Sequence, residues 1–288
     1  MDNWVKFANT LKLRIFLRQT EARPSVAQQG ISAMFNSGAQ FLDVDAAVTG
    51  FTDAPNISTP LYETDRRQLN TQLNLRASAT MHGFLTDNLD ERIDAYYGPG
   101  NPVLQGDFNN QAGPNTFSVA DISPLSPLYF ISLAQSYFLQ AEAKLRYDNE
   151  NQAKELYDMG VTEAFNKNPN FFDDDVSEAN QTWSFEAPYD AAPYIASGGV
   201  YEYPSGATFD EKLGAIITQK WIGSYPDDGA EAFFEWHRTG YPDFFTVSVN
   251  GVLGAGFPQR LLYPNSETSR NLNAPDLELI TEPIWWNQ

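Results

Sequence analysis

Residues 123–168 read SPLSPLYFISLAQSYFLQAEAKLRYDNENQAKELYDMGVTEAFNKN, and they predict two consecutive helices packed as an antiparallel pair. Apolar side chains recur at three- and four-residue spacing in both halves, which is the pattern of helices with one buried face. We expect the first helix to start at 126–127, where a serine that can act as a cap precedes a proline. A polar break at 147–150 separates the helices, and Pro169 ends the second. A link this short favours antiparallel neighbours.

Small side chains in both predicted stripes would let the two helices approach closely, as in a helix pair of the tetratricopeptide kind. They are Ala141, Ala143, Ala153, Gly160 and Ala164. The sequence holds no second clear copy of this unit, so it suggests a repeat array without establishing one.

The rest of the chain alternates between helical and irregular patterns. Scaffold helices are expected at about 2–38, 125–167 and 209–237. Loop-rich regions, marked by Gly, Pro and Asn or by the lack of a helical period, are expected at 39–124, 168–208 and 238–288. Within these ranges we predict a capping box at Ser25 and Gln28, helical turns at 78–85 and a short strand near 69–75. The fold class is therefore mostly α, a helix-pair scaffold with long irregular loops and minor β structure.

Composition excludes several classes of protein. The 288 residues carry a net charge of −19, and binding to nucleic acid needs clustered Lys and Arg, so a nucleic-acid ligand is excluded. We expect a neutral ligand or a protein partner instead. The chain has no cysteine, which rules out disulfides, thiolate metal sites and a cysteine nucleophile within it. It also lacks a run of about 18 apolar residues that could cross a membrane as a helix.

The aromatic loop 183–203 is the candidate ligand site. Sugars present faces of C–H groups that stack on flat aromatic rings, and their hydroxyls need polar side chains nearby. The polar side chains near these rings in the sequence are Asn180, Gln181, Asp190 and Glu202. The candidate ligand-binding residues are Trp183, Tyr189, Tyr194, Tyr201 and Tyr203. The competing interpretation is structural: these rings pack against the helices and hold a long loop in place.

No catalytic residue, metal ligand or cofactor is predicted. Glu231 and Glu235 share a helix face, and paired carboxylates can hydrolyse glycosides, but ordinary surface carboxylates are the favoured interpretation. The acidic run at 173–175 could bind calcium, yet it lacks the glycine spacing of a calcium loop and reads better as a solvated loop. His82 and His237 lie far apart in the sequence and lack the spacing of metal ligands.

Several short sequence motifs occur in a recognisable order along the chain. They are WVKFANTLKLRIFLR (4–18), DER (90–92), QAEAKLR (140–146), KW followed by RTGYP (220–242), PQRLLYP (258–264) and WW (285–286). Together they resemble the SusD/RagB-like family of outer-membrane lipoproteins of Bacteroidetes, over nearly the whole chain. We interpret the RTGYP phrase at 238–242 as a tight turn with a buried, hydrogen-bonded guanidinium, in preference to a ligand contact.

The resemblance implies a function as well as a fold. It implies a tetratricopeptide-like scaffold under variable loops, and a cell-surface protein that is not an enzyme. Such a protein captures a nutrient, usually an oligosaccharide or polysaccharide, and delivers it to a SusC-like TonB-dependent transporter. Family members begin with a signal peptide, an acylated cysteine and further helices. We therefore expect residues 1–288 to be a single domain that lacks its N-terminal part and lies at the outer membrane, lipid-anchored through that part.

Three other functions remain open from the sequence. The first is capture of peptides or proteins, which the RagB branch of the family suggests. The second is a secreted glycoside hydrolase that uses the acidic and aromatic residues. The third is a helical scaffold without a ligand of its own.

Overall fold

The computed structural model describes residues 1–69, 74–107, 116–167, 189–254 and 256–287. Most regular structure in these ranges is helical. The helices are α1 (Asp2–Leu17), α2 (Pro24–Asn36), α3 (Pro60–Tyr62), α4 (Ala79–Asp87), α5 (Arg92–Tyr96), α6 (Leu133–Tyr147), α7 (Glu150–Lys167), α8 (Ala192–Ile195), α9 (Phe209–Gly223), α10 (Gly229–Thr239) and α11 (Asn265–Arg270). A π-helical turn, η1 (Glu63–Gln68), follows α3, and two short strands are β1 (Ala46–Val48) and β2 (Leu128–Ile131).

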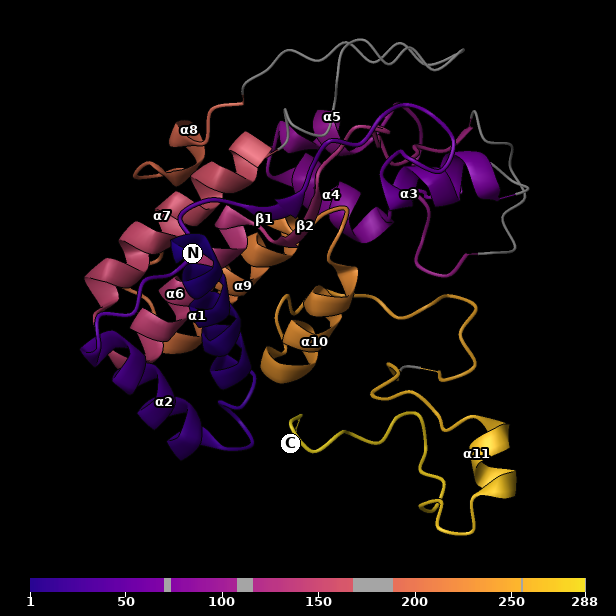
Figure 1. Cartoon of the computed structure of the whole chain (residues 1–288). Coiled ribbons are helices and arrows are strands. Elements are labelled where there is room, and N and C mark those ends of the chain that lie inside the picture. The colour runs from indigo at the N-terminus through magenta and orange to yellow at the C-terminus, as the bar shows by residue number, and fades with distance from the viewer. Residues whose placement is uncertain (70–73, 108–115, 168–188, 255, 288) are drawn as a thin grey trace.

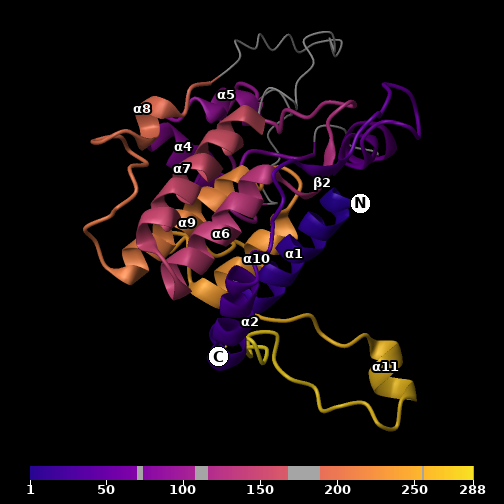
Figure 2. The same ribbon diagram turned by 60° about the vertical axis from the view of Figure 1, so that its left-hand side comes forward.

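The longer helices gather into one body around the α6–α7 pair. Figure 1 shows α1, α2, α6, α7, α9 and α10 packed together, with α3 to one side and α11 on an arm that extends away. The view of Figure 2 shows the same separation of the α11 arm from the body. None of the helices in the described ranges has the length and apolarity needed to cross a bilayer.

The predicted helix pair is confirmed. Only two residues separate α6 from α7, and the two helices share a core with α9. Phe138 of α6 packs there with Tyr157, Val161 and Phe165 of α7, all of them buried. Gly160 is required by this close approach, because a Cβ at that position would lie 2.7 Å from the Phe138 ring. Gly160 thus has the packing role that the sequence predicted, whereas Ala143 packs against α1 and α2.

The predicted start of the first helix, at 126–127, is wrong. Residues 128–131 form β2, which pairs antiparallel with β1, and α6 begins only after Ser132. The Ser132 hydroxyl caps the helix by accepting a hydrogen bond from the Gln135 backbone N–H at 3.2 Å. The partner strand lies some 80 residues earlier in the chain, and tertiary pairing of this kind overrides local helix signals.

Other predicted features are partly corrected. The capping box at Ser25 is absent, because the N-cap of α2 is Arg23, two residues earlier, with Pro24 in the first turn and no side-chain capping hydrogen bond. A capping box does form at α9, between Thr208 and Glu211. The strand predicted near 69–75 falls largely on residues outside the described ranges.

One side of α1 joins the core and the other faces outward. Leu13 and Leu17 are buried against α2 and α6. Trp4, Val5 and Ile15 expose 73%, 54% and 54% of their surface. Apolar side chains therefore lie on both sides of α1, and the structure buries one of these two faces.

Candidate functional site

The predicted site residues differ widely in how much surface they offer. Trp183 lies outside the described residues. Tyr201 and Tyr203 are buried, with 5% and 1% of their surface exposed. Tyr189 and Tyr194 are half-buried and pack against the edge of the α6–α7–α9 core. Tyr194 and Tyr201 lie side by side as stacked rings, with 5.7 Å between their centroids.

Hydrogen bonds tie this aromatic segment to the turn at 89–92. The Tyr201 hydroxyl donates to Asp90 at 2.6 Å, and the Tyr194 hydroxyl donates to the Leu89 carbonyl at 2.8 Å. Burial and the adjacent Asp90 carboxylate raise the pKa of Tyr201, so its hydroxyl stays protonated and remains a donor. Asp90 also pairs with the fully buried Arg92 at 2.6 Å.

These contacts attach the aromatic segment to the helices, as the competing structural interpretation of its rings describes. Tyr201 and Tyr203 offer almost no surface to a ligand in this structure, whereas Tyr189 and Tyr194 keep part of theirs. Ligand binding by Tyr189, Tyr194, Tyr201 and Tyr203 stays a prediction.

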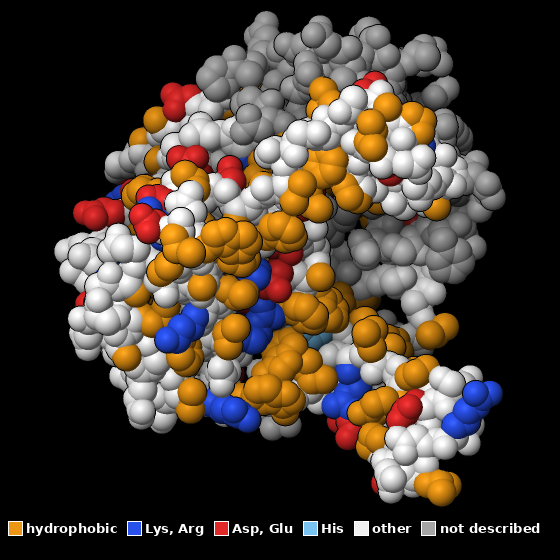
Figure 3. Space-filling view, in the orientation of Figure 1, with side chains coloured by type: hydrophobic (Ala, Val, Ile, Leu, Met, Phe, Trp, Pro, Cys, Tyr) orange, Lys and Arg blue, Asp and Glu red, His pale blue; other side chains and the backbone are white. Residues whose placement is uncertain are grey.

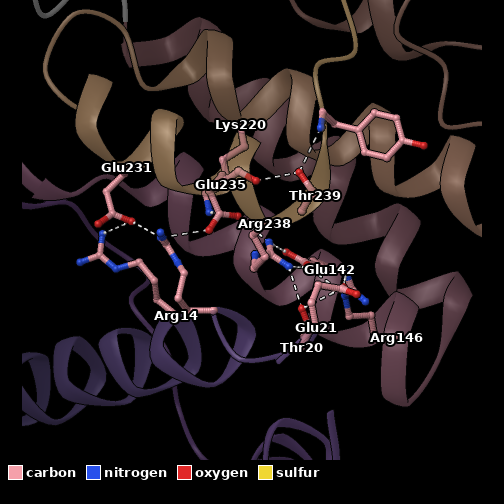
Figure 4. Close-up of polar contacts among 12 residues, drawn as sticks. Arg14, Thr20, Glu21, Glu142, Arg146, Lys220, Glu231, Glu235, Arg238 and Thr239 are labelled. Atoms are coloured by element: carbon pink, nitrogen blue, oxygen red, sulfur yellow. Dashed lines mark hydrogen bonds and ion pairs between the residues drawn. The ribbon is translucent and has the colours of Figure 1, made fainter. Parts of the chain in front are cut away.

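A second group of polar residues is a buried ion network centred on Arg238 (Figure 4). The guanidinium donates to both carboxylate oxygens of Glu142, at 2.6 and 2.8 Å, to Glu235 at 2.6 Å and to the Thr20 hydroxyl at 3.1 Å. These partners come from α6, from α10 itself and from the turn that follows α1, so one side chain joins three parts of the fold. The predicted buried, hydrogen-bonded guanidinium is confirmed, and the turn at Gly240 has the left-handed φ of 75°.

Glu235 is not the surface carboxylate that the sequence suggested. It exposes 3% of its surface and lies 2.6 Å from Arg238 and 3.1 Å from both Lys220 and Arg18. Burial alone would raise the pKa of Glu235, but these three cations outweigh it and hold the pKa well below its usual range.

The general acid of a glycoside hydrolase needs the opposite shift, a raised pKa that keeps the carboxyl protonated. The surroundings of Glu235 are therefore those of a structural ion pair. Its neighbour on the helix face, Glu231, is partly exposed and pairs with Arg18 at 2.8 Å and with Arg14 at 3.5 Å.

A third feature is a groove of about 580 Å³, which lies between α10 and residues 76–105. Residues 245–248 and 257–258 complete its walls. This volume lies within the range of small-ligand sites, roughly 300–1,000 Å³. Rings make up much of the lining, among them Trp221, Tyr225, Phe233, Trp236, Phe245 and Phe257.

The rings of the groove support one another. The Trp236 centroid lies 4.6 Å from that of Phe257 and 5.9 Å from that of Phe245. Trp221 packs edge-on against Phe245 at 5.1 Å. Figure 3 shows hydrophobic side chains gathered on this face of the molecule, including over the arm that carries α11. A ligand in the groove would therefore meet aromatic surfaces that are already held in place.

Hydroxyl and amide groups line the same groove. Thr80 and Thr246 hydrogen-bond to each other through their hydroxyls at 3.2 Å, and Ser78 approaches the side-chain oxygen of Gln105 at 3.5 Å. The Val249 backbone N–H donates to the Gln105 carbonyl at 2.9 Å, which ties the two walls together. Rings for stacking beside groups for hydrogen bonding are the arrangement that suits a polyhydroxylated ligand.

Sequence reasoning missed this groove. Trp221, Phe233 and Trp236 lie within 209–237, where the sequence predicts scaffold helices and no ligand site. A signal was present, because Phe233 and Trp236 share one face of a short helix while Phe234 lies on another, so the three cannot all face the same core. The opposite wall comes from residues more than a hundred positions earlier, which no local pattern connects to α10.

Metal binding has no candidate in the described part of the chain, where no three His, Asp or Glu side chains lie close enough to hold an ion. The acidic run at 173–175 lies outside the described residues. Both ring nitrogens of His237 contact backbone carbonyls, those of Phe233 at 2.8 Å and Pro258 at 2.9 Å.

The fold and the groove together define a class of protein, a scaffold of paired helices that carries a ligand-sized aromatic groove. A family model described as "Susd and RagB outer membrane lipoprotein" matches residues 1–281, so the chain belongs to the SusD-like family. A search of curated proteins finds no match.

Solved structures of SusD homologues share this fold over the entire chain. A homologue from Bacteroides vulgatus ATCC 8482 is 23% identical, with a TM-score of 0.75 over 99% of this chain and 62% of that one. One from Bacteroides uniformis ATCC 8492 is 24% identical, with a TM-score of 0.74 over 99% and 65%. A chitin-binding SusD homologue from Flavobacterium johnsoniae is 25% identical, with a TM-score of 0.73 over 100% and 64%. This chain spans less than two thirds of the length of each of these structures.

Proposed function

We propose that this protein captures a glycan nutrient at the outer-membrane surface without cleaving it. The observation that carries the proposal is the match to the SusD-like family over residues 1–281. It is supported by the chitin-binding relative from Flavobacterium johnsoniae, which has the same fold. The environment of Glu235 argues against this residue as the acid of a glycosidase, since the surrounding cations hold its pKa low.

The aromatic groove is the place where we propose that the glycan binds. The indole ring of Trp236 would stack on a sugar face, and the hydroxyls of Thr80 and Thr246 would bond to its hydroxyls. The loop predicted from the sequence, with Trp183, Tyr189 and Tyr194, remains a second candidate surface.

Binding to a panel of soluble polysaccharides, measured by affinity electrophoresis and calorimetry, tests the proposal. Trp236→Ala should weaken binding by about tenfold or more, as loss of a stacked ring does. Trp285→Ala is the matched control, because Trp285 is 55% exposed and lies outside the groove. Trp183→Ala tests the loop, and an effect of this variant alone would move the site there.

Other outcomes identify the competing functions. Release of reducing ends from a bound glycan would overturn capture without cleavage and support a glycoside hydrolase. Binding to a peptide panel but to no glycan would overturn glycan capture in favour of peptide capture.

We also propose that the bound glycan passes to a SusC-like TonB-dependent transporter. The proposal rests on the family alone. Co-purification of the protein with such a transporter from outer membranes, and loss of glycan uptake when that transporter is deleted, are the expected results. Normal uptake after deletion of the co-purified transporter would contradict the partnership.

A further inference from the structure

Arg76 stands out among the residues that line the aromatic groove. It carries the one charge among the lining residues in the described part of the chain, where the other members are apolar, aromatic, hydroxyl or amide side chains. No Asp or Glu is among them. The groove is thus locally cationic in a protein whose net charge is −19.

Among the described residues, the guanidinium of Arg76 has no anionic partner. It lies over the Phe117 ring at 5.2 Å, and the Arg76 backbone forms a bridge with Val119. Within the described residues the side chain makes no ion pair, and its Nη1, which is shielded from solvent, has no hydrogen-bond partner there.

An arginine in this position favours an anionic ligand. The guanidinium keeps its charge at any physiological pH, and its fork of N–H donors matches the oxygens of a carboxylate or a sulfate. A partly buried charge that has no counter-ion among the described residues is unfavourable, and an anionic ligand in the groove would reduce that penalty.

From this geometry we propose that the groove selects an acidic saccharide, whose carboxylate or sulfate pairs with Arg76 while its rings stack on the aromatic walls. The inference rests on the proposed glycan capture and adds the charge class of the glycan. It also differs from the neutral ligand that the overall charge of the sequence suggests.

The overall negative charge does not prevent this pairing. Charges on the outer surface are screened over about 8 Å at physiological ionic strength. They slow the approach of an anion, whereas the contact with Arg76 inside the groove determines how long it stays. Because Asp and Glu are absent from the described lining, a bound anion meets no carboxylate there.

The test compares saccharides that differ only in charge. Calorimetry measures the affinity for oligogalacturonate and for the same oligosaccharide with its carboxylates methyl-esterified, and in a second arm for chondroitin sulfate and its desulfated form. We expect one acidic form to bind about tenfold tighter than its neutral counterpart, as for a hydrogen-bonded charge pair. The first arm identifies a carboxylate ligand and the second a sulfate.

Variants assign the preference to Arg76. Arg76→Gln should abolish the difference between acidic and neutral forms, and Arg76→Lys should keep part of it. Arg270→Gln is the matched control, since Arg270 is exposed on α11 and lies outside the groove. Circular dichroism confirms that each variant is folded, and the comparison of ligands on the unmodified protein stands even if Arg76→Gln is not.

The two proposals fail in different ways. Equal affinity for acidic and neutral glycans, or a preference that persists in Arg76→Gln, overturns the selection of acidic saccharides and leaves glycan capture intact. Failure to bind any glycan, acidic or neutral, overturns glycan capture and this inference together.

Discussion

At the scale of single residues, Arg238 is the centre of a buried ion network. Its guanidinium is buried, and it neutralises two buried carboxylates that arrive on different helices, Glu142 and Glu235. Each of these carboxylates has another cationic neighbour, Arg146 at 2.7 Å from Glu142 and Lys220 at 3.1 Å from Glu235. Removing the centre of such a network leaves buried charges without compensation.

Arg238→Met should destabilise the protein by about 3–5 kcal/mol, the usual cost of breaking a buried ion pair by removing one partner. Chemical denaturation measures the change in the free energy of unfolding. Arg270→Met, at an exposed position on α11, is the control and should change it by less than about 0.5 kcal/mol. Equal stability of the two variants would show that the network contributes nothing to folding.

The same network predicts a dependence of stability on pH. The folded protein holds the pKa of Glu235 below its ordinary value of 4.5, because the charges of Arg238, Lys220 and Arg18 outweigh the effect of burial. A carboxyl with a depressed pKa stabilises the fold above its unfolded value, and that contribution is lost as the pH falls through the folded value.

Glu235→Gln should therefore lose less stability than the unmodified protein when the pH falls from about 5 to about 3. Denaturant midpoints at several pH values measure the two slopes. Glu267→Gln, at a position on α11, is the comparison variant and should keep the slope of the unmodified protein. Parallel slopes for Glu235→Gln and the unmodified protein would contradict the low pKa.

At the scale of elements, the α6–α7 pair depends on one close approach. Gly160 faces the Phe138 ring, and a Cβ added there would lie 2.7 Å from it, closer than side chains pack. Gly83 in α4 has no neighbour within 4 Å of the same added atom. Two helical glycines thus differ in whether they have room for a methyl group.

Gly160→Ala should destabilise the protein by about 1–3 kcal/mol, because the added methyl group overpacks the helix interface. Gly83→Ala is the matched control and should stabilise it by about 0.5–1 kcal/mol, since alanine is the better helix former. Thermal and chemical unfolding of both variants decide the matter. A stabilising Gly160→Ala would mean that the two helices are not in close contact at this point.

At the scale of the whole molecule, charge opposes compactness. With a net charge of −19 on 288 residues, the excess carboxylates of the folded protein repel one another. Salt screens such exposed charges far more than buried ion pairs such as that of Arg238 with Glu142. The network that holds the core is therefore expected to survive at ionic strengths that relieve the repulsion at the surface.

Raising NaCl from about 20 mM to about 500 mM should raise the thermal midpoint by about 2–4 °C, which corresponds to roughly 1 kcal/mol for a protein of this size. Differential scanning calorimetry measures it, and KCl at equal ionic strength serves as the control for effects specific to sodium. A midpoint that falls with both salts would show that exposed ion pairs, and not net repulsion, dominate the surface electrostatics.

Local pattern predicted the parts of the fold that depend on local chemistry. The apolar period of residues 133–167 predicted α6 and α7, and the polar residues between them predicted the turn. Both predictions succeed because the buried face of a helix and its end depend on residues close together in the sequence. The ordered phrases along the chain led to the family, which the match over residues 1–281 confirms. The buried guanidinium of Arg238 was also predicted, on the strength of its turn.

Tertiary structure decided what depends on partners distant in the sequence. Residues 128–131 are a strand and not the start of a helix because β1 pairs with them. Glu235 is a buried carboxylate because cations from α1, α9 and α10 converge on it, and its own helix face looks like an ordinary surface. The groove exists only where Arg76 and Trp236, 160 positions apart, line one space. The spacing of residues along the chain predicts which side chains are neighbours within one helix or strand. A binding site forms where several elements meet, and only their packing determines which residues meet there.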